Sequence, residues 1–220
     1  MKILAIETSG KTFSIALNEN NKTIVSFYYD FVYNIHSEML IPVIERLLHE
    51  TGSSFKSIDK FAVSIGPGSF TGIRIGITAT KILAQTLNKP IVAIDTLSIL
   101  EKSFLIIKPL KIIAAIDALR NEVYVKNSKG VIIVKNINSF IKNIKKSKKE
   151  TLIIGNATIT YKAKFIKELG KSCGANLPNI IHMPNAQTLA ILAYQQKNNT
   201  TNYEEINPLY VRRSWAENNT

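Results

Sequence analysis

The glycine-rich segment at residues 66–72, Gly-Pro-Gly-Ser-Phe-Thr-Gly, is the part of the sequence best suited to binding an anion. It follows an apolar run and opens a helical pattern, so its backbone N–H groups and the helix dipole could face a phosphate. A Walker A loop needs Gly-Lys-Ser/Thr at the helix start, whereas Ile73 and Arg74 follow the last glycine here. The glycine spacing loosely matches a dinucleotide fingerprint, for which Asp95 could contact a ribose. A sharp strand-to-helix turn is the other interpretation.

Residues that bind metals or act as nucleophiles are few and scattered. The three histidines are His36, His49 and His182, and Cys173 is the single cysteine. A lone histidine without a nearby histidine or cysteine is a poor metal site. One cysteine excludes an internal disulfide framework and a Cys-rich zinc site. We therefore predict neither a resident metal nor a catalytic residue in this chain.

Positive charge is concentrated in the second half of the chain. The sequence has 28 Lys and Arg and 16 Asp and Glu, and residues 101–220 hold 19 and 8 of these. Contact with phosphate groups, for example those of RNA, is one interpretation. A solvated lysine-rich helix is the other, and it is favoured because no aromatic residue interleaves the cluster. The densest cluster consists of Lys142, Lys145, Lys146, Lys148 and Lys149.

The elements that must position these residues alternate between strands and helices. With 220 residues, 45% of them hydrophobic, the chain can form one large domain or two lobes. Alternating and apolar runs predict strands at 2–7, 13–17, 23–29, 61–65, 91–94, 112–116, 123–125, 131–134 and 151–154. Helical periodicity predicts helices at 37–50, 73–87, 96–104, 139–146, 161–169 and 186–196.

This order predicts two α/β lobes of related design. We place an N-terminal lobe at residues 1–104 and a C-terminal lobe at 105–184. The last helix and tail, 185–220, are expected to pack back on the first lobe. The N-terminal segment reads as a strand and lacks the long apolar region of a signal peptide, and the longest apolar stretch is too short to span a bilayer. We therefore expect a cytoplasmic protein.

The predicted helix after the glycine loop has small or apolar residues on more than one side. Gly72, Gly76, Thr80 and Ala84 form one ridge at i, i+4 spacing, and a second ridge includes Ile75. Small residues allow another element to approach closely. A helix that is apolar on several sides is buried on several sides. One side should face its own sheet, and the other could face either a neighbouring helix or a partner chain.

Four motifs taken together resemble the TsaB (YeaZ) family. They are Met1 to Ser9, the run from His36 to Pro42, the segment from Gly66 to Gly76, and Ile116 to Tyr124. The order and spacing match over most of the chain, best in the first hundred residues. The resemblance implies an α/β fold of the actin-like and Hsp70-like ATPase (ASKHA) type, with two RNase-H-like lobes.

The resemblance also implies a role in forming N6-threonylcarbamoyladenosine next to the anticodon of tRNAs that read codons starting with A. In that family TsaB is a non-catalytic partner of its paralogue TsaD, joined by TsaE, and it forms homodimers when alone. TsaD-type proteins bind a metal with two histidines four residues apart, and Leu40 stands at the second position here. The implied partner-binding residues are Met39, Val43, Leu47, Arg74, Ile75, Thr78, Ala79 and Ile82. Val43→Glu or Ile75→Glu is expected to abolish pairing while leaving the fold intact.

Nucleotide contact is the least settled implication of the resemblance. Phosphate-facing turns in the superfamily match Lys11, Asp117 and Arg120, and the adenosine-side turn begins at Gly155. The sequence departs from the expected pattern at Leu119, where Arg is common, and at Asn121 and Ala157, where Gly is expected. A Cβ at Ala157 would crowd a bound base. We therefore expect no tightly bound cofactor and at most weak or interface-shared ATP or ADP. The alternative function is a nucleotide- or dinucleotide-binding enzyme that uses the Gly66–Gly72 loop.

Overall fold

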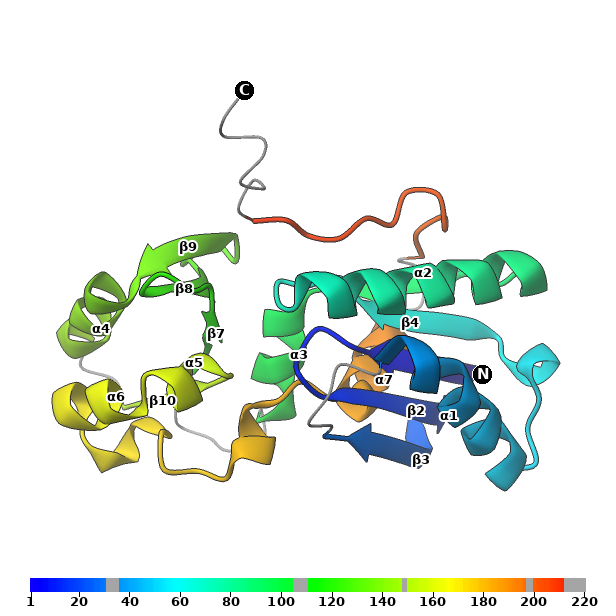
Figure 1. The fold of residues 1–220 in the computed structure, drawn as a ribbon, viewed down its shortest axis with the longest axis horizontal. Helices are drawn as coiled ribbons and strands as arrows, with labels where there is room; N and C mark the ends of the chain where they lie inside the picture. The colour runs from blue at the N-terminus through cyan, green and yellow to red at the C-terminus, as the bar shows by residue number, and fades with distance from the viewer. Residues whose placement is uncertain (31–35, 105–110, 148–149, 197–199, 212–220) are drawn as a thin grey trace. The chain divides into compact units, whose positions relative to one another are not determined.

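A computed structural model describes residues 1–30, 36–104, 111–147, 150–196 and 200–211. The chain divides into two compact units (Figure 1). Unit 1 comprises Met1–Ile99 and Pro184–Leu209, and unit 2 comprises Leu100–Met183 and the chain end from Tyr210. The sequence-based boundary at 104/105 lies five residues after the observed one. The predicted terminal segment is divided between the units, because Tyr210 belongs to unit 2.

Unit 1 is built on a five-stranded mixed sheet. The strands are β1 (Lys2–Glu7), β2 (Phe13–Glu19), β3 (Lys22–Tyr29), β4 (Lys60–Ser64) and β5 (Ile91–Ile94), in the order β3-β2-β1-β4-β5. The first three form an antiparallel meander, and β4 and β5 run parallel to β1. The helices are α1 (His36–Glu50), α2 (Phe70–Leu87), α3 (Thr96–Ser103) and α7 (Ala186–Gln195), with a short 3₁₀ helix η1 (Phe55–Ser57). α3 begins in unit 1 and ends in unit 2.

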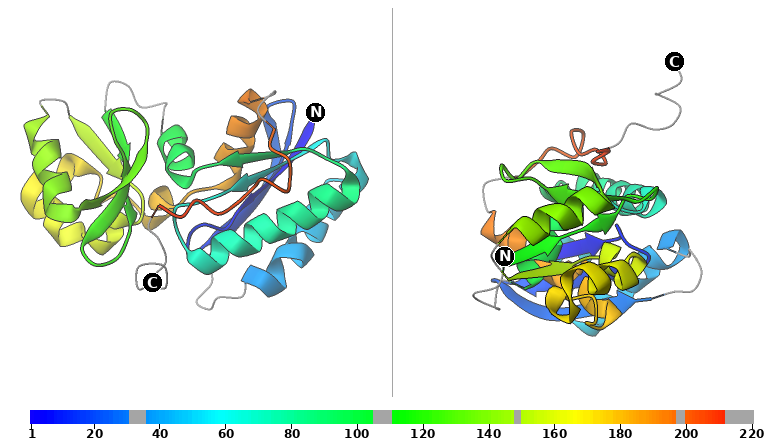
Figure 2. Two further views of the ribbon diagram at one scale, coloured as in Figure 1. Left: turned by 90° about the horizontal axis from the view of Figure 1, so that it is seen from above. Right: turned by 90° about the vertical axis from the view of Figure 1, so that its left-hand side faces the viewer.

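The alternation of side chains along the strands decides which helix covers which face. Leu4 and Ile6 belong to the core beneath α1 and α2, whereas Ile3 and Ala5 pack with α7. Both the sheet and α7 contribute alanines where they meet, and these small side chains let the helix and the sheet approach closely. Unit 1 is therefore a three-layer structure, with α1 and α2 on one side of the sheet and α7 on the other (Figure 2).

Unit 2 repeats the beginning of this order. Its strands are β6 (Lys111–Ala114), β7 (Ile116–Asp117), β8 (Glu122–Lys126), β9 (Ile132–Asn136) and β10 (Thr151–Ile154). β7, β8 and β9 form an antiparallel meander, and β10 pairs in parallel with β6. The helices are α4 (Ile137–Lys146), α5 (Ala157–Thr160) and α6 (Lys162–Leu169), followed by the 3₁₀ helices η2 (Lys171–Cys173) and η3 (Asn179–His182).

Because Ala115 alone separates β6 from β7, these two strands occupy the place that β1 has in unit 1. Both units thus contain three antiparallel strands, a helix over the second and third, a parallel strand and a further helix. The predicted pair of related α/β lobes agrees with this arrangement. The predicted helix at 161–169 is observed as α6, which begins one residue later, and the short helix α5 before it was not predicted.

Among the described residues, no helix combines the length and apolar character needed to cross a membrane. Lys148 and Lys149 of the predicted lysine cluster lie outside these residues.

Candidate functional site

The glycine loop packs against the turn between β1 and β2. Ser69 donates its backbone N–H to Ser9 O at 2.7 Å, and its hydroxyl accepts from Gly72 N at 3.2 Å as the N-cap of α2. This cap explains why α2 starts at Phe70 and not at the predicted Ile73. A Cβ at Gly68 would lie 2.2 Å from Ser9 O, and one at Gly72 would lie 2.1 Å from Thr8 O. The glycines are therefore needed for close backbone approach.

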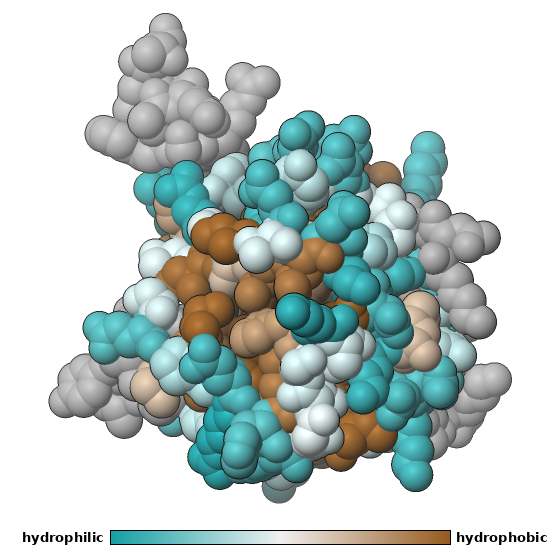
Figure 3. Space-filling view, turned by 90° about the vertical axis from the view of Figure 1, so that its right-hand side faces the viewer, coloured by the Kyte–Doolittle hydropathy of each residue, from teal (hydrophilic) through white to brown (hydrophobic). Residues whose placement is uncertain are grey.

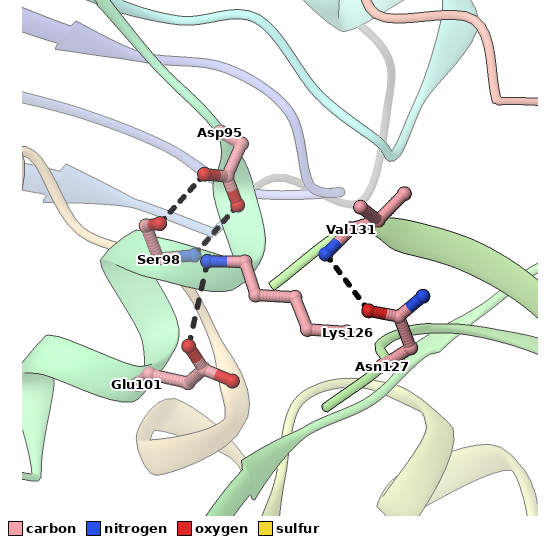
Figure 4. A network of polar contacts seen from close by, with 6 residues as sticks. All are labelled: Asp95, Ser98, Glu101, Lys126, Asn127 and Val131. Atoms are coloured by element: carbon pink, nitrogen blue, oxygen red, sulfur yellow. Dashed lines mark hydrogen bonds and ion pairs between the residues drawn. The ribbon is translucent and has the colours of Figure 1, made fainter. Parts of the chain in front are cut away.

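This packing argues against the dinucleotide-binding interpretation of the loop. A phosphate cradle presents N–H groups to open space. Here Gly68 and Gly72 face the carbonyl oxygens of the β1–β2 turn, which repel an anion. Asp95, the residue proposed to contact a ribose, instead caps α3, since its carboxylate accepts from Ser98 N at 2.8 Å and Ser98 Oγ at 2.6 Å (Figure 4).

A buried polar cluster lies at the end of β1, and the sequence analysis did not select it. Glu7 is 1% exposed, and its carboxylate accepts from Ser9 N at 2.6 Å and Ser9 Oγ at 2.5 Å. Burial raises the pKa of Glu7, and the hydrogen bonds from Ser9 oppose that rise. Ser64 at the end of β4 and Thr96 at the start of α3 are also buried. An acidic residue ending an otherwise apolar strand was the signal available in the sequence.

Unit 2 has an equivalent acid at the end of β7, and its carboxylate accepts three hydrogen bonds. Asp117 Oδ1 accepts from Leu119 N at 2.9 Å and from Tyr161 OH at 3.2 Å, and Oδ2 accepts from Thr160 Oγ1 at 3.2 Å. Burial, followed by the charge of Asp117, raises the pKa of Tyr161. Asp117 therefore joins the turn after β7 to α5 and the start of α6.

Within unit 2, the predicted residue Gly155 packs against the main chain and Arg120 is exposed. Gly155 has φ +106°, and a Cβ there would lie 2.3 Å from Ala115 O, so this glycine also serves close backbone packing. Ala157 is fully buried in the core of unit 2, so its Cβ would not crowd a bound base, contrary to the sequence-based argument. Arg120 is exposed in the turn after β7, and Lys11 is exposed in unit 1.

The turn that carries Arg120 has an unusual backbone. Leu119, Arg120 and Asn121 adopt φ values of 62°, 52° and 59°. This left-handed region is unfavourable for most residues and is tolerated best by glycine and asparagine. Leu119 is also 70% exposed. The glycine expected at position 121 would have relieved part of this strain.

The predicted partner-binding residues fall into a buried and an exposed group. Val43 and Leu47 are 3% and 0% exposed and belong to the core beneath α1. They are therefore unavailable to a partner in this structure, and the expectation that Val43→Glu would leave the fold intact is wrong. A buried, unpaired carboxylate would destabilise unit 1 itself. Met39 is half-buried, and Arg46, on the same side of α1, stacks over Phe27 of β3.

The structure shows which side of α2 is buried and which side is exposed. Gly72, Gly76, Thr80 and Ala84 are buried against the unit's own strands. Arg74, Thr78 and Ile82 are exposed, and Ile75 and Ala79 are half-buried. Ile82 is 58% exposed, and Ile41 on α1 is 38% exposed.

We name Ile41, Ile75, Thr78, Ala79 and Ile82 the α1–α2 face. Figure 3 shows apolar side chains gathered in the middle of the side of unit 1 where these helices end, surrounded by polar side chains. At the start of α2, the Arg74 guanidinium lies 3.9 Å from the centroid of the exposed Phe70 ring. On α2 itself, Ile75, Ala79 and Ile82 follow one another at helical spacing, and contiguous apolar surface marks interaction sites in many proteins.

Comparison with known proteins identifies the family. A model of the family described as "TsaD: tRNA N6-adenosine threonylcarbamoyltransferase" matches residues 31–220. The TsaB protein of Bacillus subtilis, named a tRNA threonylcarbamoyladenosine biosynthesis protein, is 30% identical over 99% of this chain and 96% of its own. The chain belongs to the TsaB family. It is also 31% identical to a tRNA N6-adenosine threonylcarbamoyltransferase of Brachyspira hyodysenteriae, over 43% of this chain and 32% of that protein.

The fold expected of the TsaB family is confirmed. The structure of YeaZ from Pseudomonas aeruginosa superimposes with a TM-score of 0.72 and 24% identity, covering 95% of this chain and 99% of that one. The α/β fold of the actin-like and Hsp70-like ATPase type, with two RNase-H-like lobes, is therefore the fold of this chain as well.

The second metal position of TsaD-type proteins is filled by a core residue in this TsaB-family chain. Leu40 lies on α1, is 1% exposed and belongs to the core beneath that helix. His182 is 1% exposed, and burial lowers its pKa. Within the described ranges, no group of three or more His, Cys, Asp and Glu residues is placed to hold a metal ion.

Proposed function

We propose that this chain takes part in forming N6-threonylcarbamoyladenosine in tRNA as a non-catalytic partner of a TsaD-type threonylcarbamoyltransferase in the cytoplasm. The observation that carries the proposal is its similarity over 99% of its length to a TsaB protein named for this biosynthesis. The match to the transferase family model adds that the chain shares ancestry with the enzyme it would assist.

Three features of the site residues support a non-catalytic role. The glycine loop faces carbonyl oxygens and not a phosphate space. Asp117 and Asp95, the two free-standing acids of the sequence analysis, are engaged by hydroxyl and N–H groups of their own neighbours. Leu40 occupies the core where a TsaD-type chain has its second metal-binding histidine. The catalytic groups would therefore come from the partner.

The α1–α2 face is the surface we propose for contact with TsaD. Its side chains are mostly apolar and are exposed or half-buried, as is usual for the centre of a protein–protein interface. The same face would pair two copies of this chain when TsaD is absent, and TsaE would join the heterodimer. Met39 and Arg74 would lie at its rim, since Met39 is partly buried against the core and Arg74 is exposed near the start of α2.

Reconstitution tests the function directly. Unmodified tRNA is incubated with ATP, threonine, bicarbonate, TsaC, TsaD and TsaE, with and without this chain, and the modified nucleoside is quantified. We expect product only when the chain is present, and no turnover by the chain alone. Equal product without it, from partners shown to be active, would contradict the proposal.

A matched pair of substitutions tests the proposed interface. Ile82 on α2 and Ile180 in η3 are each 58% exposed, so Glu at either position leaves the cores intact. Ile82→Glu is expected to weaken TsaD binding by tenfold or more, because a charge would be desolvated in the interface, at a cost of at least about 1.4 kcal/mol. Ile180→Glu should bind as the parent does. Isothermal titration of TsaD with each variant measures both, and equal binding by the two variants would reject the α1–α2 face.

Nucleotide contact remains a separate and weaker proposal. Arg120 and Lys11 are exposed cations that could approach phosphates of a nucleotide held chiefly by a partner. Asp117 and Gly155 are occupied by contacts within unit 2. We therefore propose weak or interface-shared binding of ATP or ADP. Titration of the isolated chain with ATP should give a Kd above about 0.1 mM, and submicromolar binding would overturn this proposal.

A further inference from the structure

The two units differ sharply in charge. Unit 1 holds 10 Lys and Arg and 10 Asp and Glu over residues 1–99 and 184–209. Residues 100–183 of unit 2 hold 16 Lys and Arg and only 5 Asp and Glu. Residues 100–183 therefore carry +11 of the net charge of +12, and unit 1 is neutral. A lysine-rich composition spread evenly over the chain would have raised the charge of both units.

Part of the excess positive charge is concentrated between α4 and α6. These two helices contact one another and border a groove of about 260 Å³. Lysines reach the groove from both helices, and one acidic residue lies among them. The lining residues are Asn138, Ile141, Lys142, Lys145, Lys164 and Glu168. We name this surface the α4–α6 groove.

Further lysines surround the α4–α6 groove. Lys146 follows Lys145 at the end of α4, and Lys162 and Lys167 are exposed on α6. Lys171 continues the series just beyond α6. The apolar sides of both helices are turned inward, where Phe140 and Phe165 pack edge to face. The amphipathic design of α4 therefore places its lysines outward.

The pKa of Glu168 reflects the positive charges around it. Its pKa is lowered, first by the hydrogen bond and charge of Lys145 and then by the charges of Lys167 and Lys164. Glu168 pairs with Lys145 and neutralises that one charge. Lys142 and Lys164 line the same groove and give it a net positive charge.

We propose that the α4–α6 groove binds the phosphate backbone of the tRNA substrate; this rests on the proposed function. Ammonium groups are point charges that suit phosphate oxygens. Of the described residues that line the groove, none is aromatic, so bases would not stack there. The groove therefore contributes affinity that is independent of sequence and sensitive to salt, and leaves recognition of the modified base to the catalytic partner.

A matched pair of double variants tests the location. Lys142→Gln/Lys164→Gln removes two charges from the groove, and Lys22→Gln/Lys56→Gln removes two from exposed positions of unit 1. Filter binding of an unmodified tRNA transcript to the isolated chain is measured between 50 and 200 mM salt. The groove variant should reduce the slope of log K against log salt by about 1.5 and weaken binding at low salt about tenfold. The unit 1 variant should bind almost as the parent does. Equal effects of the two variants would overturn the proposal.

Two further measurements separate this proposal from its alternatives. If vesicles containing phosphatidylglycerol bind the chain more tightly than the tRNA does, with the same dependence on Lys142 and Lys164, the groove is a membrane contact and the RNA assignment is wrong. In the reconstituted reaction, the groove variant should raise the tRNA concentration needed for half-maximal rate while TsaD binding is unchanged. Full activity of that variant at limiting tRNA would reject the groove and leave the proposed function in place.

Discussion

The first and second units place different surfaces on the same framework. In unit 1, α1 covers β2 and β3, and α2 follows the parallel strand β4. In unit 2, α4 covers β8 and β9, and α5 and α6 follow β10. The outward sides of the first pair of helices expose isoleucines, whereas the outward sides of α4 and α6 expose lysines.

The shared fold requires apolar side chains on the buried sides of the helices, and it places no such requirement on their exposed sides. The buried sides of α1 and α4 are alike, since each turns a stripe of large apolar residues toward its sheet. The solvent-facing sides differ in chemistry, which is why we propose a protein partner for unit 1 and a polyanion for unit 2. Function therefore has to be argued from the surfaces and not from the fold they share.

The largest effects should come from charges placed in the equivalent interiors. Val43 on α1 and Ile141 on α4 are 3% and 4% exposed. Val43→Glu and Ile141→Glu should each lower the free energy of unfolding by several kcal/mol, about 3–5, because the carboxylate is buried without a partner. Chemical denaturation followed by circular dichroism measures this. A variant that keeps the parent's midpoint would show that the helix concerned is not packed as described.

Substitution of the glycines that allow close backbone approach should give the next largest losses of stability, in both units. A Cβ at Gly72 would meet Thr8 O at 2.1 Å, and one at Gly155 would meet Ala115 O at 2.3 Å. Alanine at either site should cost about 1–3 kcal/mol through overpacking. This holds at Gly72 although alanine normally stabilises a helix, and at Gly155 the φ of +106° adds backbone strain.

Gly76→Ala is the control for this pair. The Cβ at position 76 would meet the Thr8 hydroxyl at 2.2 Å, and a side chain can give way more easily than a carbonyl of the main chain. Thermal unfolding of the three variants should rank Gly76→Ala as the least affected. Stabilisation by Gly72→Ala would contradict the close approach of α2 to the β1–β2 turn.

The sequence allowed most elements of the fold to be predicted, because period and polarity are local properties. Strands 2–7, 91–94 and 151–154 were predicted with the observed ends, and α1 and α7 to within one residue. The errors lie where a tertiary contact decides the outcome. α2 gains a turn through the Ser69 cap, and the unpredicted helix α5 ends at Thr160, whose hydroxyl donates to Asp117.

The candidate site was harder to predict, because exposure depends on how helices sit on the sheet. Periodicity identifies an apolar stripe but not which ridge faces inward, so Val43 and Leu47 were assigned to the surface although they are buried. Ile41 was missed for the same reason. The purpose of the glycines was also hidden, since a phosphate loop and a close backbone approach use the same residue type.

The acids that end the first strand of each unit should respond differently to substitution. Glu7 is buried and its pKa is raised by burial, whereas Asp117 is held by hydroxyl and N–H donors. A raised pKa in the folded state gives stability that is full below pH 4.5 and is lost as the pH rises. Glu7→Gln should therefore gain stability relative to the parent between about pH 4 and pH 7. Unfolding midpoints across this range measure the gain, with Glu45→Gln as the exposed control. A constant difference between Glu7→Gln and the parent would show that the carboxyl group does not resist ionisation.

The smallest expected effects compare the hairpin turns of the two units. The β2–β3 turn of unit 1 uses Asn20 and Asn21 at φ 50° and 68°, whereas the β7–β8 turn of unit 2 places Leu119 at φ 62°. Asparagine tolerates this region and leucine does not, so Leu119→Asn should stabilise the protein by about 1 kcal/mol and Asn21→Leu should destabilise it by a similar amount. Because Leu119 is 70% exposed, its replacement removes little packing. Shifts of opposite sign in the melting temperatures would confirm that the two turns differ in strain. Shifts of the same sign would mean that the exposed leucine makes stabilising contacts, and the turn of unit 2 would then be a packed surface and not a strained one.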